Sequence, residues 1–196
     1  IEDAALDPHV ARIASIHFAE TLTNNPGASA TTIALWDCAI PEGPLACDTA
    51  EGYLLRDFWK YMTRVLADRE SRVITFNGTT FDIPFIMRRS LILGVKPSVN
   101  IEQGKYRTTD GRANHIDIRR VLAETSPGGG ITDFRGGNLD YYGKLLVGRG
   151  KKEGCDGQQV ATWFAAGRYD FIEEYGEHDA LLALELHEKL RGFYYT

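Results

Sequence analysis

The first part of the chain contains two short, mostly apolar stretches. They cover residues 12–18 and 31–36 and are rich in isoleucine, threonine and aromatic residues. The sequence Asn-Asn-Pro-Gly at 24–27 lies between them and is typical of a turn. The pattern therefore predicts an antiparallel hairpin in this region.

The rest of the chain alternates between helical periodicity and short apolar runs. Residues 49–67 have apolar side chains at helical spacing, and the run 72–76 predicts a buried strand. An Asn-Gly turn then leads into a helix that begins near residue 83 and ends at Gly94. Further elements are expected at 116–122 (a strand or a helix start), 139–147 and 158–166 (short helices) and 169–191 (a long helix).

The order of strand, turn and helix is that of an α/β unit. We therefore expect an α/β fold with a mixed sheet, an antiparallel N-terminal hairpin and flanking helices. The 196 residues are enough for one domain with a sizeable core, so we expect a single domain over residues 1–196.

Composition narrows the possible functions. The chain is 43% hydrophobic and 25% charged, and no stretch approaches the roughly 18 apolar residues of a membrane helix. Three cysteines without a C-x-x-C pair are expected to be reduced thiols, which suggests a cytoplasmic protein. The net charge of -5 argues against binding nucleic acid mainly by neutralising phosphates, but it allows an enzyme whose carboxylates hold metal ions.

Asp82 is the first candidate for chemistry. It follows the strand predicted at 72–76, and open α/β sheets bind ligands at the carboxyl ends of their strands. Alternatively, Asp82 caps the next helix, whose first turn contains Pro84. The two roles are compatible.

Asp179 is the second candidate. Tyr175, Asp179, Leu182 and Leu186 share one face of the long C-terminal helix, and the leucines mark that face as the inward one. A buried carboxylate needs a partner such as a metal ion, an arginine or several hydrogen bonds. The neighbouring His178 points about 100° away around the helix and is expected at the surface.

His115 and Asp117 point the same way if they lie on a strand, toward water or a cleft, where they could support a site. Phosphate contacts could come from Lys151 and Lys152 in a basic, glycine-rich loop. Arg88 and Arg89 belong to the helix after Asp82 and are expected on its solvated face. The remaining basic candidates for phosphate contacts are Arg107 and Arg149.

Two motifs carry a resemblance to a known family. Asn77-x-x-x-Phe81-Asp82 and Tyr175-x-x-x-Asp179 together resemble motifs of the DnaQ-like (DEDD) 3′-to-5′ exonucleases of the RNase H-like superfamily. The tyrosine version fits, because the histidine version would need His where this chain has Glu174. The resemblance covers nearly the whole chain and is closest to predicted exonucleases that resemble the family B DNA polymerase proofreading domain.

The first family motif, Asp-x-Glu, fits Glu2, followed by Leu6-Asp7-Pro8. The Asp of that motif would fall one position before Ile1, so we expect the first strand to be truncated in this sequence.

The resemblance implies a two-metal site. Glu2, Asp82 and Asp179 would hold two Mg²⁺ or Mn²⁺ ions, which prefer oxygen ligands, and Tyr175 would orient the attacking water. Of the substrate-binding candidates, Phe81 would offer a stacking face and Asn77 would either contact the terminal nucleotide or brace Asp82. Lys151 and Lys152 are the candidates for phosphate contacts.

The activity implied is hydrolysis of phosphodiester bonds at the 3′ end of single-stranded or frayed DNA. An RNase D-like exoribonuclease is an alternative within the same class. The first-motif Asp is expected before Ile1 and is not part of the given sequence. A catalytically inactive nucleic-acid-binding module is therefore an alternative from another class. A small-molecule hydrolase on a related sheet is the third possibility.

Overall fold

The computed structural model describes residues 7–9, 11–22, 25–38, 46–68, 70–101, 114–124, 137–152, 154 and 157–194. Within them, β1 (Ser15–Leu22) pairs antiparallel with β2 (Asn25–Ala34). The second pair is parallel and joins β3 (Val73–Thr75) to β4 (His115–Asp117). The predicted α/β class, with its antiparallel hairpin, is confirmed.

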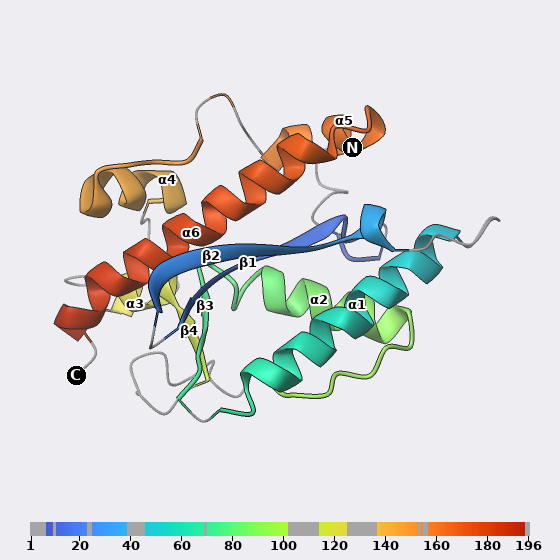
Figure 1. The fold of residues 1–196 in the computed structure, drawn as a ribbon, viewed down its shortest axis with the longest axis horizontal. Helices are drawn as coiled ribbons and strands as arrows, with labels where there is room; N and C mark the ends of the chain where they lie inside the picture. The colour runs from blue at the N-terminus through green and yellow to red at the C-terminus, as the bar shows by residue number, and fades with distance from the viewer. Residues whose placement is uncertain are drawn as a thin grey trace.

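The helices cover both faces of the hairpin. Figure 1 shows α6 (Tyr169–Tyr194) along one face of β1 and β2, and α1 (Ala46–Val65) along the opposite face beside α2 (Asp82–Ile92). The remaining helical elements are short: η2 (Leu35–Asp37), α3 (Ile118–Glu124), α4 (Leu139–Tyr142), η4 (Gly143–Val147), η5 (Gly157–Gln159) and α5 (Val160–Ala165). Among these described residues the elements have the arrangement of an RNase H-like fold.

Two apolar clusters hold these layers together. The apolar stripe predicted for α1 is buried and packs against α2, with Leu55, Phe58, Trp59 and Met62 nearly inaccessible. The second cluster joins α3 to α6 through Ile118, Leu122, Ala183, Leu186 and Leu190. The C-terminal helix is therefore fixed between the hairpin on one side and α3 on the other.

The predicted hairpin has the right pairing but the wrong bounds. Residues 25–27, predicted as a turn, belong to β2, and Trp36 lies in the 3₁₀ turn η2 rather than in a strand. Cross-strand backbone hydrogen bonds do not require apolar side chains, so pairing continues past the apolar stretch from which the strands were predicted. The short helices predicted at 139–147 and 158–166 are only partly α-helical. In the first, α4 continues into the π-helical η4, and in the second, α5 begins after the 3₁₀ turn η5.

A buried ion pair ties the α1–α2 layer to the segment before β1. Arg89 of α2 is 4% exposed and binds Glu51 of α1 through Nε (2.8 Å) and Nη2 (2.5 Å). The expectation that Arg89 lies on a solvated face is therefore wrong, whereas Arg88 is exposed as expected. Helical neighbours point about 100° apart, so one of two adjacent arginines can face inward.

None of the helices in the described part of the chain combines the length and apolar character that a membrane span requires.

Candidate active site

The long helix α6 brings Tyr175 and Asp179 to one face, one turn apart, as the sequence pattern predicts. Leu182 on the same face is completely buried, and the Asp179 side chain is 21% exposed. The partner of Asp179 is Lys151 from the loop after η4. Its Nζ lies 2.5 Å from Asp179 Oδ2 and 2.7 Å from the Tyr175 hydroxyl oxygen.

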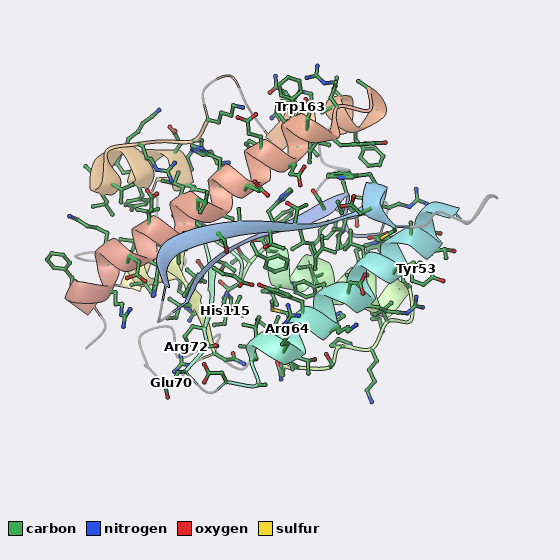
Figure 2. The ribbon with its side chains drawn as sticks, viewed as in Figure 1. Tyr53, Arg64, Glu70, Arg72, His115 and Trp163 are labelled. Carbon is green, nitrogen blue, oxygen red and sulfur yellow. The ribbon has the colours of Figure 1, made fainter. Side chains whose placement is uncertain are left out.

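Aromatic side chains surround this cluster. The Lys151 Nζ lies 4.9 Å from the Tyr175 ring centroid, close enough for a cation–π contact. Figure 2 shows Trp163 on α5 beside the first turns of α6, and its ring centroid is 6.1 Å from that of Tyr175 and 5.8 Å from that of Phe171. The Tyr175 ring therefore contacts both a charged group and an aromatic group.

The electrostatics of the cluster follow from its partial burial. Burial raises the pKa of Asp179, although the Lys151 ammonium opposes this effect. Burial alone would lower the pKa of Lys151, but its hydrogen bonds to Asp179 and Tyr175 raise it, so this lysine stays charged. Burial also raises the pKa of Tyr175, so its hydroxyl keeps its proton at neutral pH.

Asp82 is the first residue of α2 and reaches the solvent. Enough protein surrounds it that desolvation raises its pKa to about 6, the charge of Asp117 adds to this, and a hydrogen bond from its own backbone works against it. The alternative role of Asp82 as a helix cap is not found, because Phe81 occupies the N-cap position and no side chain caps there. Asp82 still lies in the first turn, where the helix dipole favours a negative charge.

Asp117 stabilises the turn that leads to Asp82 through hydrogen bonds. The Asp117 carboxylate accepts hydrogen bonds from the backbone N–H groups of Asn77 (2.8 Å) and Thr79 (2.9 Å), from the Thr79 hydroxyl, and from the N–H of Arg119 (3.1 Å). Asn77 has a φ of 73°, in the left-handed region that non-glycine residues seldom adopt. The contacts with Asp117 hold it there.

The Asn77 side chain also stabilises this turn by hydrogen bonds. Its Oδ1 accepts hydrogen bonds from Arg119 Nη1 (2.9 Å) and the Thr80 hydroxyl (2.6 Å). These contacts tie Asn77 to Thr80 in the turn before Asp82 and to Arg119 of α3. Phe81 is 39% exposed, and its ring centroid lies 5.6 Å from that of Phe85.

The expectation that His115 and Asp117 face water or a cleft is wrong. Both are 1% exposed, and Figure 2 shows His115 in the interior of the molecule at the β3–β4 pair. His115 Nε2 hydrogen-bonds to the Thr75 hydroxyl (2.9 Å). The signal that could have placed Asp117 is its position just before a helix, because Asp commonly satisfies the free N–H groups of a helix start.

His178 is also not a plain surface residue. It is partly buried, and its Nε2 lies 3.0 Å from the backbone oxygen of Gly150. Of the other basic candidates, Lys152 is paired with Glu174, and Arg149 makes two hydrogen bonds to Glu185 at 2.7 and 2.6 Å. These pairs belong to the surface beside the Asp179 cluster.

Glu2 and Arg107 lie outside the described residues. Among the residues that are described, no three carboxylate, histidine or cysteine side chains come together as a complete metal site.

Comparison with known proteins connects this geometry to a family. Residues 6–191 match the family described as predicted 3′-5′ exonucleases related to the exonuclease domain of PolB. The chain belongs to this family. It is also 30% identical to DNA polymerase 1 of Aeropyrum pernix over 156 residues, which are 76% of this chain and 15% of the polymerase. The chain thus spans a small part of that relative's length.

Exonuclease domains of the PolB-related kind generally use divalent metals, and one feature of this family member fits such an ion. Asp179 Oδ1 is buried and has no hydrogen-bond partner in the described part of the structure. A buried carboxylate oxygen without a partner is costly, and oxygen is the ligand that Mg²⁺ and Mn²⁺ prefer. The donor chemistry of Asp179 therefore fits a divalent cation.

Proposed function

We propose that the protein is a metal-dependent 3′-to-5′ exonuclease that shortens single-stranded or frayed DNA from the 3′ end. The observation that carries the proposal is the pair Tyr175 and Asp179 on the inward face of α6, with Asp179 Oδ1 left without a partner. The family and the similarity to a DNA polymerase support this substrate class.

In this proposal, Glu2, Asp82 and Asp179 hold two Mg²⁺ or Mn²⁺ ions. When bound, such ions lower the pKa of a water nucleophile and stabilise the charge on the phosphate. The raised pKa of Asp82, about 6, supports a role in the site, because perturbed carboxylates gather at functional sites. Asp82 is still mostly ionised at neutral pH and can act as a ligand.

Tyr175 keeps its proton, so its role is to orient the water through its hydroxyl rather than to act as a base. Phe81, with its exposed ring, offers a stacking surface for the terminal base. Asn77 braces the turn before Asp82 through its contacts with Arg119 and Thr80. Lys152 and Lys151 supply positive charge for the phosphates of the incoming strand.

The test uses the full-length protein with end-labelled single-stranded DNA, duplex DNA and single-stranded RNA, each with Mg²⁺, Mn²⁺ or EDTA. We expect stepwise shortening from the 3′ end of single-stranded DNA that EDTA abolishes. Faster shortening of RNA would indicate the RNase D-like alternative. DNA binding without cleavage in any metal would indicate an inactive binding module, and turnover of free nucleotides alone would indicate a small-molecule hydrolase.

Substitutions test the residues assigned to the site. Asp82→Ala and Asp179→Ala should each lower the rate by about 1,000-fold, because each removes a metal ligand. Tyr175→Phe should cost less, about 10- to 100-fold, because it removes only a group that positions the water. Asp170→Asn is the matched control on the same helix. Asp170 is exposed and pairs with Arg168, so the rate should not change. Full activity in both alanine variants would refute the two-metal assignment.

A further inference from the structure

The Lys151 ammonium supplies the positive charge beside Asp179 in this structure. This ammonium contacts both Asp179 Oδ2 and the Tyr175 hydroxyl. In the proposed function Asp179 binds metal and Tyr175 orients the water, so Lys151 links these two residues. Its side chain is 28% exposed, so the contact is partly shielded from water. An ion pair of this kind is stronger than one on an open surface.

The backbone that carries Lys151 is held on three sides. The Lys151 N–H donates to Asp140 Oδ1 (2.9 Å), and the Gly150 backbone oxygen lies 3.0 Å from His178 Nε2. Arg149 is bound to Glu185 of α6 through two nitrogens. The loop that carries Lys151 is thus anchored to α4 and α6. Its backbone is held in place where the Lys151 side chain can reach Asp179.

Gly150 allows this arrangement without any shift of the neighbouring side chains. A Cβ at Gly150 would collide with the Asp140 carboxylate and with the Lys144 side chain. The loop therefore lies close against α4, and the start of the Lys151 side chain is set by this packing. The contact with Asp179 is a built feature rather than one of many positions of a free surface lysine.

We propose that Lys151 is an internal counter-ion that holds Asp179 and Tyr175 in place without metal, and that a divalent cation must displace it from Asp179 in order to bind. This inference rests on the proposed function, because it takes Asp179 as a metal ligand. A divalent cation on the unpartnered Asp179 Oδ1 and the Lys151 ammonium on Oδ2 would share one carboxylate, and two cations that close repel each other. Metal binding and the Lys151–Asp179 contact are therefore alternatives.

The displaced ammonium has a second place to go. The Tyr175 ring lies beside the Lys151 ammonium and can hold it by a cation–π contact after the ion pair with Asp179 is broken. There it is free to meet a phosphate oxygen of the substrate. A bound strand then favours the displaced lysine, and so favours metal binding, which makes the two ligands cooperative. Lys151 would lower metal affinity in the free protein and raise the dependence of metal binding on substrate.

The test measures metal binding without any nucleic acid. Metal-free wild type, Lys151→Met and Lys189→Met are titrated with Mn²⁺, and the concentration of free Mn²⁺ is measured by electron paramagnetic resonance. Methionine keeps the unbranched apolar stem but removes the charge. We expect Lys151→Met to bind Mn²⁺ about 5- to 10-fold more tightly than wild type, within the range of ordinary coupling between sites. Lys189→Met is the control, because Lys189 is exposed on the same helix as Asp179 and has no role in the site, so its affinity should equal that of wild type.

A second arm links the effect to Asp179. In an Asp179→Asn background, the further change Lys151→Met should no longer tighten Mn²⁺ binding, because the contact it removes is already lost. In EDTA, Lys151→Met should melt at a lower temperature than wild type, and saturating Mn²⁺ should restore more of its stability. A tightening that persists in the Asp179→Asn background would overturn the proposal, since it would show an effect of charge alone.

The outcomes separate this inference from the function on which it rests. If wild type binds Mn²⁺ and shortens DNA while Lys151→Met binds Mn²⁺ no more tightly, the counter-ion role is wrong and the exonuclease proposal stands. If Mn²⁺ binding follows the expected pattern but no DNA is shortened, the function is wrong and the counter-ion role stands. If neither protein binds Mn²⁺, both are wrong.

Discussion

At the scale of single residues, the buried Asp117 decides the path of the chain toward Asp82. Its carboxylate joins the turn after β3 to the start of α3, through the backbone N–H groups of Asn77, Thr79 and Arg119. Hydrogen bonds to a charged acceptor are stronger than neutral ones. Asp117 is a positioning residue for Asp82, because it touches the turn and not the proposed metals.

We expect Asp117→Asn to lower the free energy of unfolding by about 1–3 kcal/mol, because the amide cannot accept the full set of hydrogen bonds. Exonuclease turnover should also fall, by about 10-fold, with little change in KM, because a misplaced Asp82 affects the reaction more than binding. Urea unfolding and steady-state kinetics measure the two effects.

Asp68→Asn is the control for this change. Asp68 also accepts hydrogen bonds from a backbone N–H, that of Glu70 (3.1 Å), and from a hydroxyl, that of Ser71 (3.0 Å), but it is exposed and lies in another turn. Its substitution should leave turnover unchanged. A destabilised Asp117→Asn with normal turnover would reduce Asp117 to a purely structural role.

At the scale of elements, the approach of α6 to the hairpin is set by one glycine. Gly176, directly after Tyr175, faces the ring of His17 on β1, and a Cβ there would overlap that ring. Burial lowers the pKa of His17 to about 4, so the ring is neutral at neutral pH and hydrogen-bonds to Ser15 and Thr32. The closeness of helix and strand also fixes the height of Tyr175 and Asp179 above the sheet.

Gly176→Ala should lower the free energy of unfolding by about 1–3 kcal/mol, because an overfilled contact forces the helix or the ring to move. Gly192→Ala on the same helix is the matched control. A Cβ at Gly192 would meet nothing within 4 Å. Alanine is the better helix former by roughly 1 kcal/mol, so this variant should be as stable as wild type or more so. Urea unfolding compares the two, and equal stabilities would refute the tight contact at Gly176.

At the scale of the whole molecule, the Glu51–Arg89 pair connects segments that are distant in the sequence. Arg89 and Glu51 bind each other, and each makes a further hydrogen bond. Arg89 donates to the backbone oxygen of Pro8 (3.0 Å), and Glu51 accepts a hydrogen bond from the backbone N–H of Ile13 (3.0 Å). The pair thus ties α1 and α2 to the segment that precedes β1. Every one of these groups is satisfied, as buried charges require.

We expect Arg89→Met to lower the free energy of unfolding by about 3–5 kcal/mol, because it leaves the Glu51 charge buried without its partner. Adding Glu51→Gln to this variant should recover part of the loss by removing that charge. The exposed neighbour Arg88 provides the control, and Arg88→Met should stay within about 0.5 kcal/mol of wild type. Equal losses in the two single variants, measured by urea unfolding, would contradict the role assigned to the pair.

Local pattern was enough to predict much of this molecule. The helix periodicity predicted α1 and α6 and the inward face that carries Asp179, and the strand, turn and helix order predicted β3 and α2. The two exonuclease-like motifs also indicated the family that the comparison confirmed. These features depend on spacing along the chain, because a helix or strand repeats its geometry every few residues.

The tertiary structure alone decided which charged groups meet. Nothing in the sequence neighbours of Arg89 or Lys151 shows that the first is buried, or that the second is bound to Asp179 and Tyr175. The partners of Arg89 and Lys151 lie 24 or more positions away along the chain, so the pairing depends on how separate elements pack. Sequence by itself determined where Asp82 and Asp179 stand on their elements. Packing determined what they touch, because burial and charge pairing are properties of distant segments brought together.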